Sequence, residues 1–259
     1  MGFFDFFRKK SEDNVADSPA KPSETRKDGQ IVLARVSFPD GYVSPSGGFS
    51  NGAYYEVCGK NPKTGRVNKR KVVARSEKEA IDKVWNEHGF TDASASCIPF
   101  AAPTEKQLDF AKRLHLFIPE GADENDVACM LHRIADAVPG VDDPDFSPIA
   151  ECSQEFADYL TENGAIFSAY IDAGGGFEVA ARSLPPREKC KLYAYCVWCH
   201  FKKEPVSVPI RHPQEWLFDQ FADEYCENSE FLEALGRAPF LFMHGNEKTV
   251  KIAKDFLQI

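Results

Sequence analysis

The pattern of apolar and polar positions is clearest over residues 103–138, where it predicts two short helices. Thr104 can cap the first helix, and Gln107 three residues later completes a capping box. Apolar residues then recur on one helical face from Leu108 to Leu114. Asp123 is placed to cap the second helix. Its apolar positions repeat at intervals of three and four residues: Val127, Met130, Leu131, Ile134 and Val138.

The region before this helical hairpin has the alternation of β-strands. The predicted strands are 31–38, 54–58, 67–74 and 94–100, and the second and third are joined by turn residues into a β-hairpin. Ser76 and Glu79 form a second capping box at the start of a helix that Gly89 should end in the left-handed conformation. The inward positions of that helix are predicted to be Ala80, Ile81, Val84 and Trp85.

After a stretch rich in proline and aspartate, the pattern of residues 148–259 is almost wholly helical. The expected helices are 153–162, 177–184 after a glycine turn at 174–176, one from Pro186, 213–226, 231–235 and 246–257. The fold class is therefore α+β. The predicted divisions are a disordered tail (1–30), a small α+β module (31–100), the helical hairpin (103–138) and an α-helical domain (148–259).

Composition supports a mostly folded chain, because 43% of the residues are apolar and 12% are aromatic. Residues 11–30 are the exception, since they are polar and contain two prolines. No apolar run reaches the roughly 18 residues of a membrane-spanning helix. The start of the chain does not have the form of a secretory signal, and the eight cysteines are scattered. We therefore expect a cytoplasmic protein, or one peripheral to the inner face of the membrane.

The first ten residues combine aromatic rings with positive charge. The segment consists of Phe3, Phe4, Phe6 and Phe7 followed by Arg8, Lys9 and Lys10. It could anchor the chain at a membrane surface, or dock into an apolar groove of a protein partner, or be an unstructured start that happens to be aromatic.

The net charge is −9, which excludes a protein that coats nucleic acid over its whole surface. The charge is uneven, however: residues 31–102 carry +3 and residues 141–259 carry −9. The predicted β-hairpin is strongly basic and has no acidic residue between its ends. Its cations are Lys60, Lys63, Arg66, Lys69, Arg70, Lys71 and Arg75.

A basic two-stranded ribbon can follow phosphates or enter a major groove, so this hairpin is a candidate contact for DNA or RNA. Alternation along the strand places Lys69 and Lys71 on one face and Arg70 on the other. The alternative is a solvated hairpin whose charges prevent pairing with other chains.

The segment CVWCH, with Cys196, Cys199 and His200, fits the attachment motif of c-type haem. Covalent haem attachment requires export, for which there is no signal. Zinc is a second interpretation, with Cys190 as a further ligand, but no second paired motif exists. The apolar surroundings favour a third interpretation, in which these cysteines are small core residues.

Several segments resemble a family of bacterial proteins of unknown function that accompany mobile or phage-derived DNA. The resemblance covers roughly residues 54–235. It is carried by YEVCGKNPKTGR, KVVARSEKEA, PTEKQLDFAKRL with IPEGA, FSAYI and FADEY. These motifs are structural rather than catalytic, so the resemblance implies no activity, cofactor or site.

No catalytic motif is present, and the sequence implies no cofactor. We therefore expect a non-enzymatic accessory protein that contacts nucleic acid through residues 60–75. The alternatives are an adaptor tethered to a membrane or a protein partner by the phenylalanine-rich start, and a metal-binding protein or enzyme.

Overall fold

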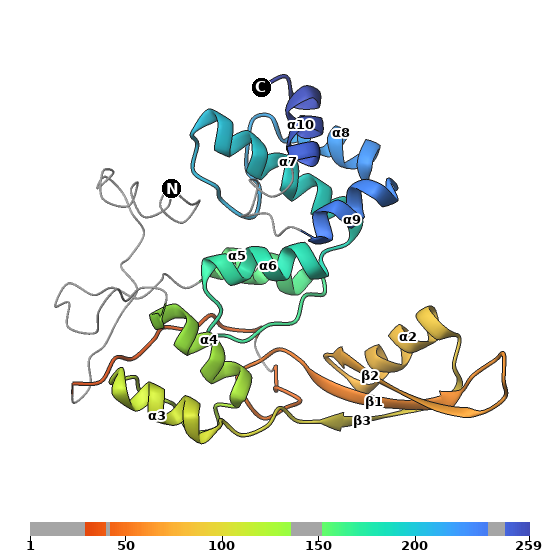
Figure 1. Cartoon of the computed structure of the whole chain (residues 1–259), viewed down its shortest axis with the longest axis vertical. Coiled ribbons are helices and arrows are strands. Elements are labelled where there is room, and N and C mark those ends of the chain that lie inside the picture. The colour runs from red at the N-terminus through yellow and green to blue at the C-terminus, as the bar shows by residue number, and fades with distance from the viewer. Residues whose placement is uncertain (1–28, 40–41, 136–151, 238–246) are drawn as a thin grey trace. The chain divides into compact units, whose positions relative to one another are not determined.

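The computed structural model describes residues 29–39, 42–135, 152–237 and 247–259. These residues form two compact units. The sheet unit contains the described residues up to 135 together with 166–172, and the helical unit contains 152–165 and the described residues from 173 onward. The chain is thus α+β, as its sequence predicts (Figure 1).

The sheet unit is built on a three-stranded antiparallel sheet in the order β2–β1–β3. The strands are β1 (Ala53–Lys60), β2 (Val67–Ala74) and β3 (Thr91–Ile98). Helix α2 (Glu77–His88) covers one face of this sheet (Figure 1). The buried residues between sheet and helix are Ala53, Tyr55, Val57, Ala74, Ala80, Val84 and Phe90.

Helix α2 begins and ends as predicted, but its capping box is incomplete and Trp85 is not on its buried face. The Ser76 hydroxyl accepts a hydrogen bond from the Glu79 backbone N–H, and Gly89 adopts φ 66°. The Glu79 carboxylate accepts from the Arg75 N–H instead of closing the box on Ser76. Trp85 is 53% exposed, so its inward placement was wrong. It lies about 100° around the helix from Val84, beyond the stripe that faces the sheet.

Residues 31–38 do not form the predicted strand. Ile31 makes an isolated parallel bridge with Leu116, and the Val36 N–H donates to the Ala169 carbonyl. Leu33 and Val36 are nevertheless buried. Their apolar side chains therefore reach the core from an extended segment that has no continuous hydrogen-bond ladder with a neighbouring strand.

The helical hairpin consists of α3 (Glu105–Arg113) and α4 (Glu124–Ala135). Both parts of the capping box between Thr104 and Gln107 are present. Leu108 is 43% exposed and lies off the buried stripe, whereas Val138 is outside the described residues. The shared core contains Ala111, Leu114, Val127, Met130, Leu131 and Ile134.

The helical unit contains α5 (Gln154–Glu162), α6 (Ala173–Ser183), α7 (Pro186–Lys202), α8 (Glu215–Tyr225), α9 (Ser229–Arg237) and α10 (Glu247–Leu257). The expected glycine turn at 174–176 is instead part of α6. A Cβ on Gly176 would lie 2.9 Å from a ring carbon of Phe156, so glycine here lets α6 approach α5 closely. None of the helices in the described part of the chain combines the length and apolar character that a membrane crossing requires.

Candidate nucleic-acid interface

The turn of the basic hairpin is fixed by hydrogen bonds around Asn61. Its side-chain oxygen accepts from the Lys63 N–H at 2.9 Å, and its backbone carbonyl accepts from the Gly65 N–H at 2.8 Å. Gly65 has φ 66°, which glycine adopts readily. Lys63 and Arg66 are exposed on this ordered turn.

The strand register separates the basic side chains between the two faces of the sheet. Directly paired residues of an antiparallel ladder share a face. Arg70 pairs with the buried Val57 and therefore lies on the face toward α2. Lys69 and Lys71 lie on the opposite face, as alternation predicts. We call this opposite face the open face; it consists of Tyr54, Glu56, Cys58, Lys60, Val67, Lys69, Lys71, Val73, Ser94, Ser96 and Ile98.

An aromatic pair lies at one end of the open face. The Lys71 ammonium is 3.9 Å from the centroid of the Tyr54 ring, and the ring of Phe100 meets Tyr54 edge-on at 5.2 Å. A cation over a ring face is held by the ring quadrupole. Lys71 is thus positioned above the sheet by Tyr54.

Two other lysines of the hairpin are paired with carboxylates. Lys69 Nζ lies 2.8 Å from Glu56 Oε1, and Lys60 Nζ lies 2.8 Å from Asp92 Oδ2. The hydrogen bond that Lys69 donates to Glu56 raises the pKa of Lys69, and the one that Lys60 donates to Asp92 raises the pKa of Lys60 and lowers that of Asp92. All four side chains are substantially exposed, so these pairs add little to stability.

The remaining cations of the hairpin fall into two groups. Lys63, Arg66 and Arg70 are exposed, and no carboxylate in the described residues lies within ion-pair distance of them. Arg75 is half-buried at the start of α2, away from the turn. The structure therefore groups Lys60, Lys69 and Lys71 on one face and Lys63 with Arg66 at the tip.

A buried carboxylate centre that the sequence did not reveal lies at the start of α4. Asp126 Oδ1 accepts from the hydroxyls of Ser168 at 2.6 Å and Ser50 at 3.4 Å. Its Oδ2 accepts from the backbone N–H groups of Phe49 at 2.8 Å and Asp123 at 3.2 Å. With four donors around it, Asp126 is satisfied and ties three chain segments together, which is a structural role.

Asp123 caps α4 as predicted, because its Oδ1 accepts from the N–H groups of Asn125 and Asp126. Burial raises the pKa of Asp123, and the neighbouring Asp126 charge adds to this. The spacing D-x-x-D signals the cap. The partners of Asp126 in other segments, 42 to 77 residues away in the chain, leave no such signal.

A histidine–carboxylate pair lies further along α4. His132 Nδ1 is 2.8 Å from the buried Asp172 Oδ2, an arrangement that orients an imidazole ring. Cys129 is one turn earlier, but burial raises the pKa of its thiol to about 12. A thiol with that pKa is protonated at neutral pH and is a poor nucleophile.

The cysteines of CVWCH lie in the core of the helical unit. Cys196 and Cys199 are buried in α7, and burial raises the pKa of both thiols, to about 11 for Cys199. Cys190 is also buried, and His200 is half-buried. In the described part of the chain, no group of three or more His, Cys, Asp or Glu side chains is arranged to hold a metal.

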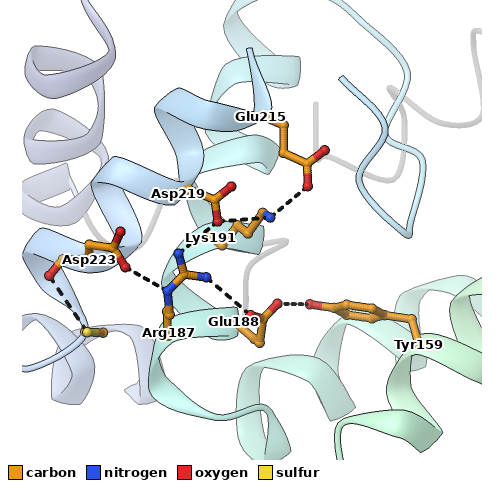
Figure 2. A network of polar contacts seen from close by, with 8 residues as sticks. Tyr159, Arg187, Glu188, Lys191, Glu215, Asp219 and Asp223 are labelled. Atoms are coloured by element: carbon orange, nitrogen blue, oxygen red, sulfur yellow. Dashed lines mark hydrogen bonds and ion pairs between the residues drawn. The ribbon is translucent and has the colours of Figure 1, made fainter. Parts of the chain in front are cut away.

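The network of polar contacts in Figure 2 joins α7 to α8. Lys191 Nζ lies between Glu215 at 2.7 Å and Asp219 at 3.0 Å. Arg187 contacts Asp219 at 3.0 Å and Asp223 at 2.7 Å. Each of the two cations on α7 contacts two carboxylates on α8, so this network stabilises the packing of the two helices.

The phenylalanine-rich segment from Phe3 to Lys10 lies outside the described residues, so its anchoring and docking roles stay predictions. No match to this chain was found among protein-family models, curated proteins or solved structures. The resemblance to proteins of mobile DNA likewise stays a prediction from the residues quoted for it.

Proposed function

We propose that this protein binds nucleic acid through the open face of its sheet and the adjoining turn. The observation that carries the proposal is the placement of Lys71 on the open face, with Lys63 and Arg66 exposed on the turn that joins β1 to β2. None of these three cations has a carboxylate partner among the described residues. Cations free of carboxylates can release counterions from a phosphate backbone, which is the main source of affinity for nucleic acid.

The hairpin is also rigid enough to present these charges together. Both of its strands are paired along their length, and β3 supports β1 on the other side. The competing interpretation is that the charges only keep the edge strand β2 from pairing with other chains. That role needs charge but no defined arrangement, so a binding experiment separates the two.

The test is binding of short labelled duplex and single-stranded DNA and RNA between about 50 and 200 mM salt. The variant Lys63→Glu/Arg66→Glu/Lys71→Glu removes the cations without carboxylate partners. We expect tight, salt-sensitive binding by the unmodified protein. The variant should bind far more weakly, and the slope of log affinity against log salt should flatten by about two to three.

A matched control is Lys78→Glu/Lys106→Glu/Lys112→Glu, which reverses three exposed lysines of α2 and α3 in the same unit. It changes the net charge equally but leaves the hairpin intact, so it should bind nearly as the unmodified protein does. Equal losses in the two variants would point to a general charge effect. Absence of binding by the unmodified protein at low salt would contradict the proposal.

A further inference from the structure

Glu56 lies at the centre of the open face. It is on the middle strand β1, and its partners across the sheet are Lys71 on β2 and Ser96 on β3. Its carboxylate reaches diagonally to Lys69 Nζ at 2.8 Å. One carboxylate therefore lies among the cations that the proposed function assigns to phosphates.

Asp92 has the same relation to Lys60. Its Oδ2 is 2.8 Å from Lys60 Nζ, and both side chains are more than half exposed. Asp92 also has φ 51°, a conformation that few residues other than Gly, Asn and Asp adopt. The pair is thus positioned by the backbone at the start of β3.

From this geometry we infer that Glu56 and Asp92 are internal competitors that limit the affinity of the open face for a nucleic-acid backbone. The inference rests on the proposed function. A phosphate that binds Lys69 or Lys60 must replace a carboxylate that already holds the ammonium group. The displaced carboxylate then stays close to the phosphate, and like charges at that distance repel.

This competition selects for ligands with many phosphates. A single phosphate gains one ammonium contact and loses one ion pair, so its net gain is small. A polynucleotide first contacts the cations that have no carboxylate partner, Lys63, Arg66 and Lys71, which raises the local phosphate concentration beside the two paired lysines. The acidic pairs therefore favour a continuous nucleic-acid backbone over free nucleotides or inorganic phosphate.

The test is the variant Glu56→Gln/Asp92→Asn, which keeps the size of both side chains and removes their charge. Asparagine also tolerates the backbone conformation at position 92. With Lys60 and Lys69 freed, the slope of log affinity for a labelled duplex against log salt should steepen by about two. The affinity lost between about 50 and 200 mM salt should accordingly grow by about tenfold.

The matched control is Glu77→Gln/Asp82→Asn, which removes two exposed carboxylates of α2 and changes the net charge equally. The control should leave the slope unchanged. If the unmodified protein binds and Glu56→Gln/Asp92→Asn behaves like the control, the competition is refuted while the proposed function stands. If neither the unmodified protein nor Glu56→Gln/Asp92→Asn binds at low salt, both fail.

Discussion

Gly48 lies so close to the carboxylates of Asp123 and Asp126 at the start of α4 that no other residue fits without movement. A Cβ built on it would be 2.4 Å from Asp123 Oδ2 and 2.8 Å from Asp126 Oδ2. Both carboxylates are held by several hydrogen bonds, so they cannot move aside without breaking some of them. The absence of a side chain at position 48 is therefore a requirement of the buried centre.

We expect Gly48→Ala to lower the free energy of unfolding by about 1–3 kcal/mol, the usual cost of overpacking a buried site. Urea titration followed by circular dichroism measures this change. The control is Gly236→Ala in α9, where a Cβ meets nothing within 4 Å and helix propensity improves. If both variants are equally stable, the close approach at Gly48 has no energetic consequence.

Residue-level prediction from sequence succeeded where the signal is local. The caps at Thr104 and Asp123 and the left-handed Gly89 each depend on neighbours within a few positions. The opposite faces of Lys69 and Arg70 followed from strand alternation. The carboxylates that neutralise Lys60 and Lys69, and the hydroxyl of Ser168 on Asp126, are set by tertiary structure, and no spacing rule indicates them.

At the scale of secondary-structure elements, helices α7 and α8 are joined by ion pairs whose two cations differ in burial. The Lys191 side chain is only 14% exposed, whereas that of Arg187 is 42% exposed. Burial disfavours the charge of Lys191, yet the hydrogen bonds that it donates to Glu215 and Asp219 raise its pKa above the usual value. Removing this lysine would leave two carboxylates close together without their shared cation.

We expect Lys191→Ala to destabilise the protein by about 1–3 kcal/mol, between the values for surface and buried ion pairs. Because folding raises the pKa of Lys191, its contribution is complete below the unfolded pKa of about 10.4 and is lost as the pH rises further. Chemical denaturation at neutral pH and above that pKa tests both statements.

The comparison for this prediction is Arg182→Ala, which breaks an exposed pair with Glu178 within α6. That change should cost less than about 0.5 kcal/mol. A Lys191→Ala protein no less stable than Arg182→Ala would show that the pairs between α7 and α8 contribute nothing beyond surface charge.

The type of a helix or strand was predictable wherever the periodicity of its apolar residues was strong. The errors arose where tertiary packing decided the secondary structure. The strand β2 has the predicted bounds, and α7 begins at Pro186 as expected. The glycines at 174–176 indicated a turn, but they lie inside α6, where Gly176 leaves room for the ring of Phe156. Residues 31–38 alternate like a strand, but of these eight residues only Ile31 makes an isolated bridge in the described structure.

At the scale of the whole molecule, the sheet unit is discontinuous in sequence. Residues 166–172 belong to it although they follow α5 of the helical unit. The backbone of Ala169 bonds to Val36 and Phe49, and that of Phe167 bonds to Asn51. No local pattern in the segment FSAYI indicates these long-range hydrogen bonds.

We expect a fragment of residues 29–151 to unfold without cooperativity, because it lacks the 166–172 segment and the Ser168 donor to Asp126. Joining residues 166–172 to this fragment through a Gly–Ser linker should restore a cooperative transition. Thermal melting followed by circular dichroism makes the comparison. The same linked fragment with Ser168→Ala is the control and should melt at a lower temperature. Identical melting of all three would contradict this account.

The discontinuity of the sheet unit also affects the order in which parts of the protein can fold during its synthesis. The sheet, α2, α3 and α4 leave the ribosome well before residue 166, since chains grow at roughly 5–20 residues per second. Until residue 172 has emerged, the hydroxyl of Ser168 and the backbone of Ala169 are not available to their partners. The nascent sheet unit therefore lacks residues 166–172 while α5 of the other unit is being synthesised. A chaperone that protects incompletely folded chains would act on it during this interval.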